Sequence, residues 1–88
     1  MIARHLITRK LAACANIMAP HKAVYEWQGH TESGAETAMI LKSRENLFEQ
    51  VKDEICAHHS YDCPCIISWP VISGHEPFLQ WIEDQTAV

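Results

Sequence analysis

Apolar residues recur with helical spacing in three segments, at the start, in the middle and at the end of the chain. The first predicted helix begins at Ile2, and the second has Ser43 as its candidate N-cap and ends near His58. The third covers residues 76–85, with Pro77 in its first turn. The predicted inward stripes are Ile2, Leu6, Ile7 and Leu11; Leu47, Phe48, Val51 and Ile55; and Phe78, Leu79 and Ile82.

Between these helices the apolar residues are typical of extended chain. Residues 15–28 favour strand, with an interruption at Pro20, which lacks the N–H that a central strand donates. Residues 29–34 are predicted as a turn and residues 36–42 as a strand that pairs with the preceding one in a hairpin. A further strand is predicted over residues 65–71, bounded by prolines.

The predicted order is helix, strand, strand, helix, strand, helix over a single domain of residues 1–88, which indicates an α+β sandwich of the ferredoxin-like type. Such a unit begins with a strand that is central in its sheet, whereas this chain opens on a helix. Two neighbouring strands would be left with unpaired backbone groups. We therefore expect either that the sequence is part of a longer gene product or that another segment fills the gap.

Composition narrows the class of partner. At 88 residues and 10.0 kDa the chain can bury only a modest core, so a partner subunit is expected to contribute to its stability. The formal charge is −4, and the seven Lys and Arg residues are scattered, which argues against nucleic acid. No apolar run approaches the ~20 residues of a membrane span, and no signal-peptide core is seen. We expect a cytoplasmic protein with its four cysteines as reduced thiols.

Short motifs follow one another along nearly the whole chain: LAACANI (residues 11–17), YEWQG (25–29), MILK (39–42), HHSY (58–61), WPV (69–71) and LQW (79–81). In this order they resemble the CutA family of divalent-cation tolerance proteins. The resemblance implies a ferredoxin-like fold, a PII-like homotrimer, a cytoplasmic location and tolerance to divalent metals, copper above all. The alternative is a PII-like signalling or small-ligand-binding module without a metal function.

The resemblance also marks a candidate metal segment. His58 and His59 match positions implicated in copper binding in the family, and Cys63 and Cys65 follow closely. These four side chains suit copper, or zinc as the alternative cation, and two thiols at i, i+2 on a strand share one face. The family's first-strand cysteine has no counterpart here. The competing interpretation is that the histidines are solvated at a helix C-terminus and that Cys65 is a small buried residue.

Other residues carry weaker hypotheses. Cys14 and Cys56 are predicted to lie in the core. The aromatic residues Tyr25, Trp27, Trp69 and Trp81 are candidate subunit contacts, with ordinary core packing as the alternative. The remaining histidines are predicted to be isolated and exposed, without a role: His5, His21, His30 and His75.

An enzyme is not expected. The one possible nucleophile and base would be Cys63 or Cys65 with His58 or His59, and no third residue is evident to orient them. The sequence contains no phosphate-binding loop, dinucleotide fingerprint or serine elbow. The residues therefore favour a binding protein.

Overall fold

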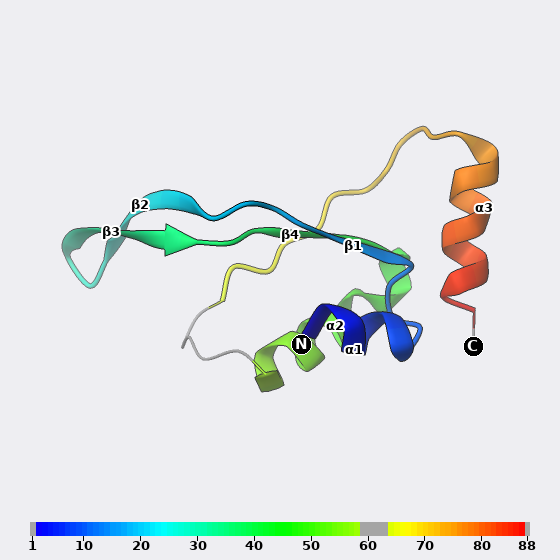
Figure 1. The fold of residues 1–88 in the computed structure, drawn as a ribbon, viewed down its shortest axis with the longest axis horizontal. Coiled ribbons are helices and arrows are strands. Elements are labelled where there is room, and N and C mark those ends of the chain that lie inside the picture. The colour runs from blue at the N-terminus through cyan, green and yellow to red at the C-terminus, as the bar shows by residue number, and fades with distance from the viewer. Residues whose placement is uncertain (1, 59–63, 88) are drawn as a thin grey trace.

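The computed structural model describes residues 2–58 and 64–87, which form an α+β fold with three α-helices and two small antiparallel sheets (Figure 1). Its elements in chain order are α1 (Ile2–Thr8), β1 (Cys14–Ile17), β2 (His21–Trp27), β3 (His30–Glu36), β4 (Met39–Lys42), the 3-10 helix η1 (Glu45–Leu47), α2 (Phe48–His58) and α3 (Glu76–Gln85). The α+β class and all three predicted helices are confirmed. No helix in the described part of the chain has the length and apolar character needed to cross a membrane.

Helix α1 ends in a Schellman motif. Lys10 adopts a left-handed conformation with φ of 61°, the Leu11 N–H donates to the Leu6 carbonyl, and the Lys10 N–H donates to the Ile7 carbonyl. The accompanying apolar contact joins Leu6 to Leu11 in the core. The chain therefore reverses direction at Lys10, and the residues that follow can enter the sheet.

The predicted hairpin of residues 36–42 with the preceding extended segment is confirmed. Strand β2 pairs with β3 and β1 pairs with β4, so β1 and β2 form one arm of the hairpin and β3 and β4 form the other. The turn between β2 and β3 is tighter than predicted: Gln28 and Gly29 both have positive φ, as a two-residue type I′ turn requires, and β3 begins at His30. The interruption at Pro20 is confirmed, because it lies between β1 and β2.

Two further predictions are wrong. Ser43 does not cap a helix: its Oγ donates to the Leu11 carbonyl at 2.6 Å, and the residue before η1 is Arg44, whose side chain makes no capping bond. Residues 65–71 form no strand, because none of the four described strands pairs with them. Proline at positions 64 and 70 removes two backbone donors that a ladder would need.

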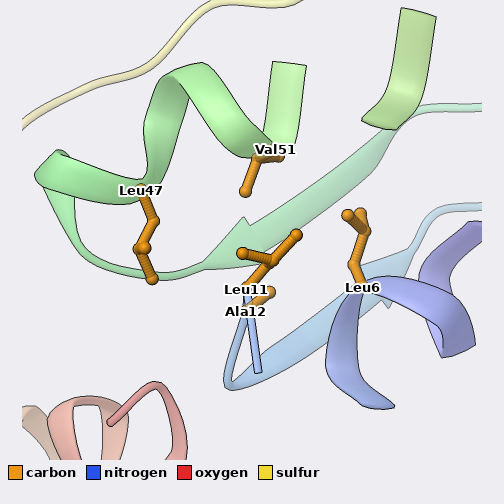
Figure 2. Close-up of a cluster of buried hydrophobic side chains, with 5 residues drawn as sticks. All are labelled: Leu6, Leu11, Ala12, Leu47 and Val51. Atoms are coloured by element: carbon orange, nitrogen blue, oxygen red, sulfur yellow. The ribbon is translucent and has the colours of Figure 1, made fainter. Parts of the chain in front are cut away.

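The core lies between α1, η1, α2 and the β1–β4 sheet. Figure 2 shows a cluster of five buried side chains from α1, the segment between α1 and β1, η1 and α2: Leu6, Leu11, Ala12, Leu47 and Val51. Met39 and Leu41, two residues apart on β4, pack against the same cluster, as residues on one face of a strand do. This arrangement holds α1 and α2 against one another on the sheet.

Arg44 forms hydrogen bonds to Thr86, the residue that follows helix α3. The Arg44 Nε donates to Thr86 Oγ1 at 2.9 Å, its Nη2 donates to the Thr86 carbonyl, and Thr86 is fully buried. The Thr86 hydroxyl in turn donates to the Ile82 carbonyl at the end of the helix. A buried polar group is thus satisfied, and α3 gains a fixed C-terminal anchor.

Candidate metal centre

Of the four predicted metal ligands, the structure describes two. His58 is exposed at the last residue of α2, and Cys65 is exposed in the segment before α3. His59 and Cys63 lie outside the described residues, so the four-ligand site stays a prediction. Within residues 2–58 and 64–87, the side chains gathered with His58 are His5 and Glu54, which with it make the candidate metal centre.

Two neighbouring helices supply this site. Glu54 and His58 are at i, i+4 on α2, which places both on one face of the helix. His5 comes from α1, where the next residue, Leu6, packs in the core with Val51. The apolar packing of α1 on α2 therefore determines that His5 lies over Glu54, although 49 positions separate them in sequence.

The three side chains are within reach of one ion. The His5 Nε2 and Glu54 Oε2 atoms are 2.9 Å apart, the two imidazole centroids are separated by 5.2 Å, and one potential ligand atom from each residue lies within 4.8 Å of the others. A tetrahedral zinc site needs ligand atoms about 3.3 Å apart, since its bonds are about 2.0 to 2.1 Å. Small rotations of these partly exposed side chains would close the difference.

A hydrogen bond prepares His58 for this role. Its Nδ1 lies 2.8 Å from the Glu54 backbone carbonyl, which can only accept, so Nδ1 carries a proton and Nε2 keeps its lone pair in the neutral ring. Histidines that bind metals commonly donate their second nitrogen to a carbonyl in this way. His58 therefore presents Nε2 as its ligand atom.

Glu54 is ionised near neutral pH. The hydrogen bond from His5 is the largest cause of a lowered pKa of the Glu54 carboxyl, and the charges of Arg9, His5 and His58 lower it further, while partial burial opposes them. Arg9 Nη1 lies 3.3 Å from the second oxygen, Oε1. The carboxylate thus faces His5 with one oxygen and Arg9 with the other, and a cation bound at Oε2 would replace the proton shared with His5.

Two members of this cluster, His5 and Glu54, were not predicted from the sequence. His5 was predicted to be isolated and exposed, but it is partly buried and bonded to Glu54; His21, His30 and His75 are exposed as predicted. The Glu54 and His58 spacing was a readable signal, since i, i+4 residues share a helix face. The contribution of His5 could not be read from the sequence, because it depends on how two distant helices pack.

The cysteine and aromatic predictions have mixed outcomes. Cys56 is exposed, so its assignment to the core is wrong, and Cys14 is only half-buried. Tyr25, Trp27, Trp69 and Trp81 are all exposed within this chain, with Trp69 at 78%, which excludes the alternative of ordinary core packing inside one subunit. Their assignment to subunit contacts stays a prediction.

Residues 1–85 match the sequence profile of the family described as CutA1 divalent ion tolerance protein. The chain is 46% identical over 83 residues to the divalent-cation tolerance protein CutA of Archaeoglobus fulgidus, an alignment that covers 94% of this chain and 80% of the relative. It is 36% identical over 85 residues to the chloroplastic protein CutA of Arabidopsis thaliana, covering 97% of this chain but only 47% of that protein.

Solved structures agree in fold. The structure titled as the periplasmic divalent cation tolerance protein CutA from Archaeoglobus fulgidus superposes with a TM-score of 0.93 at 45% identity, over 97% of this chain and 82% of that one. The divalent cation tolerance protein from Thermus thermophilus superposes with a TM-score of 0.94 at 31% identity, over 98% of this chain and 84% of that one.

Proposed function

Because the chain belongs to the CutA1 divalent ion tolerance family, we propose that it binds a divalent cation, copper foremost, through His58 and the side chains gathered around it. The observation that carries the proposal is the cluster of His5, Glu54 and His58, whose potential ligand atoms lie within 4.8 Å of one another. Two imidazoles and a carboxylate are ligands that copper(II) and zinc accept.

The predicted segment of His58, His59, Cys63 and Cys65 belongs to the same proposal. It shares His58 with the described cluster, so one ion could draw on both sets of ligands. A copper(I) ion would favour the thiols of this segment, whereas copper(II) would favour the nitrogen and oxygen ligands of the cluster. The oxidation state therefore separates the two ligand sets experimentally.

Titration of the full chain with copper(II) chloride, followed by isothermal calorimetry and native mass spectrometry, tests the proposal. We expect one tight ion per chain in the unchanged protein and at least a tenfold weaker affinity in His58→Ala. His75→Ala is the matched control, because His75 is also exposed and lies outside the cluster. Equal copper affinities in all three proteins would refute a site at His58.

A homotrimer with a PII-like arrangement and a ferredoxin-like sheet is part of the proposal, because the chain leaves unusual surface uncovered. Its accessible surface is 6971 Å², against about 5,200 Å² for a folded monomer of this mass. Its radius of gyration is 14.8 Å, against about 12 Å for a compact chain of this length. Large apolar side chains are exposed along β2 and residues 64–75, as on a surface that subunits cover.

Light scattering after size exclusion tests the assembly. We expect a trimer in the unchanged protein and a shift toward monomer in Trp69→Asp, which places a charge on the proposed contact. Trp69→Phe keeps an apolar ring and is expected to stay trimeric. A monomeric unchanged protein at micromolar concentration would contradict the assembly.

We further propose a binding protein rather than an enzyme, located in the cytoplasm. The relatives are named for cation tolerance and not for a reaction. An expression study with a fluorescent fusion would test the location.

A further inference from the structure

We infer that the ion held by His5, Glu54 and His58 is a borderline divalent cation of the zinc and copper(II) class, and that it acts as a crosslink that fastens α1 to α2. This inference rests on the cation site of the proposed function. It adds the exclusion of magnesium, calcium and copper(I), and a structural consequence of binding, namely that occupancy of the site governs how firmly α1 is held.

The position of the site in the fold supports a crosslinking role. Helix α1 has seven residues, which is too short for a stable isolated helix, so it depends on its contacts. Among the described residues, the side-chain hydrogen bonds to α2 from α1 and the residue that follows it are those of His5 and Arg9, and both end on Glu54. An ion there would tie the two helices at the point where their polar contact is already concentrated.

The separation of His5 and Glu54 in the sequence means that an ion bound to both would stabilise the folded state. His5 and Glu54 are 49 positions apart, so the two side chains meet only in the folded chain, and an ion that needs both as ligands binds the folded state and not the unfolded one. The hydrogen bond present without metal is partly exposed to water and is correspondingly weak. Coordination bonds to one ion would be less easily exchanged with water, because a metal site of this kind adds binding free energy to folding.

The ligand set determines the class of ion. Magnesium and calcium prefer all-oxygen sites, and this cluster offers one carboxylate beside two imidazoles. Copper(I) prefers sulfur, which this cluster lacks. The Nδ1 hydrogen bond of His58 to the Glu54 carbonyl already supplies the supporting contact found around zinc-bound histidines.

Hydrogen exchange of the full chain, measured with zinc chloride and with magnesium chloride, tests the inference. At a free zinc concentration about 100 times the dissociation constant, opening that breaks the site is suppressed about 100-fold. We therefore expect zinc to slow exchange of the Arg9 and Leu11 amides, which bond to the His5 and Leu6 carbonyls, by about that factor. Magnesium is expected to have no effect.

Two variants identify the ligand that carries the crosslink. His5→Gln removes the α1 ligand but leaves Glu54 and His58 on α2, so it is expected to lose the zinc-dependent protection of α1. His30→Gln, an exposed histidine on β3 outside the cluster, is the control and is expected to keep that protection. Metal-free exchange of the α2 amides checks that each variant is folded, and His5→Asn serves as a second variant if His5→Gln is not.

Native mass spectrometry of the same samples separates the two levels of failure. If zinc binds at one ion per chain without protecting α1, the crosslink is refuted and the cation-binding proposal stands. If neither zinc nor copper(II) binds, both are refuted. Equal protection by magnesium would refute the assigned class of ion, and full protection in His5→Gln would refute the role of His5.

Discussion

Two regions of this molecule use similar apolar residues in opposite ways. In the first, made of α1, β1, β4, η1 and α2, Leu6, Leu47 and Val51 are buried against one another. In the second, made of the β2–β3 hairpin and residues 64–87, Val24 is 66% exposed and Ile72 is 95% exposed. The contrast shows that apolar character alone does not say whether a side chain is buried by its own chain.

The candidate metal centre belongs to the first region, where packing fixes the side chains that carry it. Leu6 follows His5 in sequence, and Val51 lies one helical turn before Glu54, so the core and the cluster adjoin one another on the same helix pair. The second region instead presents exposed aromatic residues. One part of the molecule thus buries its apolar side chains within the chain and carries the candidate site, and the other part has an exposed apolar surface that suits subunit contact.

Leu6→Ala tests the contrast most strongly. Leu6 is fully buried, so its truncation removes apolar contacts and leaves a cavity, and we expect a loss of about 2 to 5 kcal/mol in the free energy of unfolding. Val24→Ala, at an exposed position of the hairpin, is the control and is expected to change it by less than about 0.5 kcal/mol in dilute protein. Urea denaturation followed by circular dichroism measures both, and comparable losses would erase the distinction between the regions.

Arg44→Met tests the link between the regions. The substitution keeps an apolar stem but leaves the buried Thr86 oxygens without the Arg44 donors, at an expected cost of about 1 to 3 kcal/mol. Helix α3 is expected to exchange its amide hydrogens faster, while α1 and α2 are unchanged. Arg4→Met, on the exposed side of α1, is the control. An intact α3 in Arg44→Met would mean that its apolar contacts alone hold it.

Lys10→Gly, in the first region, is expected to raise the free energy of unfolding. A non-glycine residue with positive φ costs about 1 kcal/mol relative to glycine, and Lys10 has φ of 61° at the end of α1. We expect thermal denaturation to show a gain of about 0.5 to 1 kcal/mol. Thr8→Gly, in the helix itself, is expected to lose stability instead. A loss in Lys10→Gly would show that its side chain makes a contact that offsets the backbone strain.

The sequence predicted the helices well because each carries its own periodic stripe, and α2 and α3 end where their patterns indicated. The hairpin was also predicted, but the extent of its strands was not. The type I′ turn at Gln28 and Gly29 lacks the asparagine or aspartate that is common in such turns, so residues 29–34, most of β3, were predicted as a turn. Strand β4 pairs with β1, which lies at the start of the extended segment that was predicted to be its partner.

The candidate site was predictable only in part. His58 was identified from its resemblance to the family, and its i, i+4 partner Glu54 was readable from the sequence. His5 could not be predicted, since the sequence around a histidine on one helix does not indicate which other helix it will contact. Ser43 shows the same limit: a residue typical of an N-cap instead donates to the distant Leu11 carbonyl. Local patterns predict elements, whereas contacts between distant elements decide the site.

The smallest expected effect concerns acid stability and again distinguishes the regions. His5, together with Arg9 and His58, holds the pKa of Glu54 below its usual value of 4.5, so the folded state favours the ionised carboxylate. The resulting stabilisation is present above the unfolded pKa and is lost as the pH falls through the folded value. Urea midpoints in metal-free buffer are therefore expected to fall less between about pH 5 and about pH 3 in Glu54→Gln than in the unchanged protein.

Glu32→Gln, on the exposed hairpin, is expected to follow the unchanged protein, because Glu32 has no ion-pair partner among the described residues. The same acid dependence in Glu54→Gln and the unchanged protein would show that the contact between α1 and α2 at Glu54 adds nothing to stability without a metal ion, and that the first region is held by its apolar core alone.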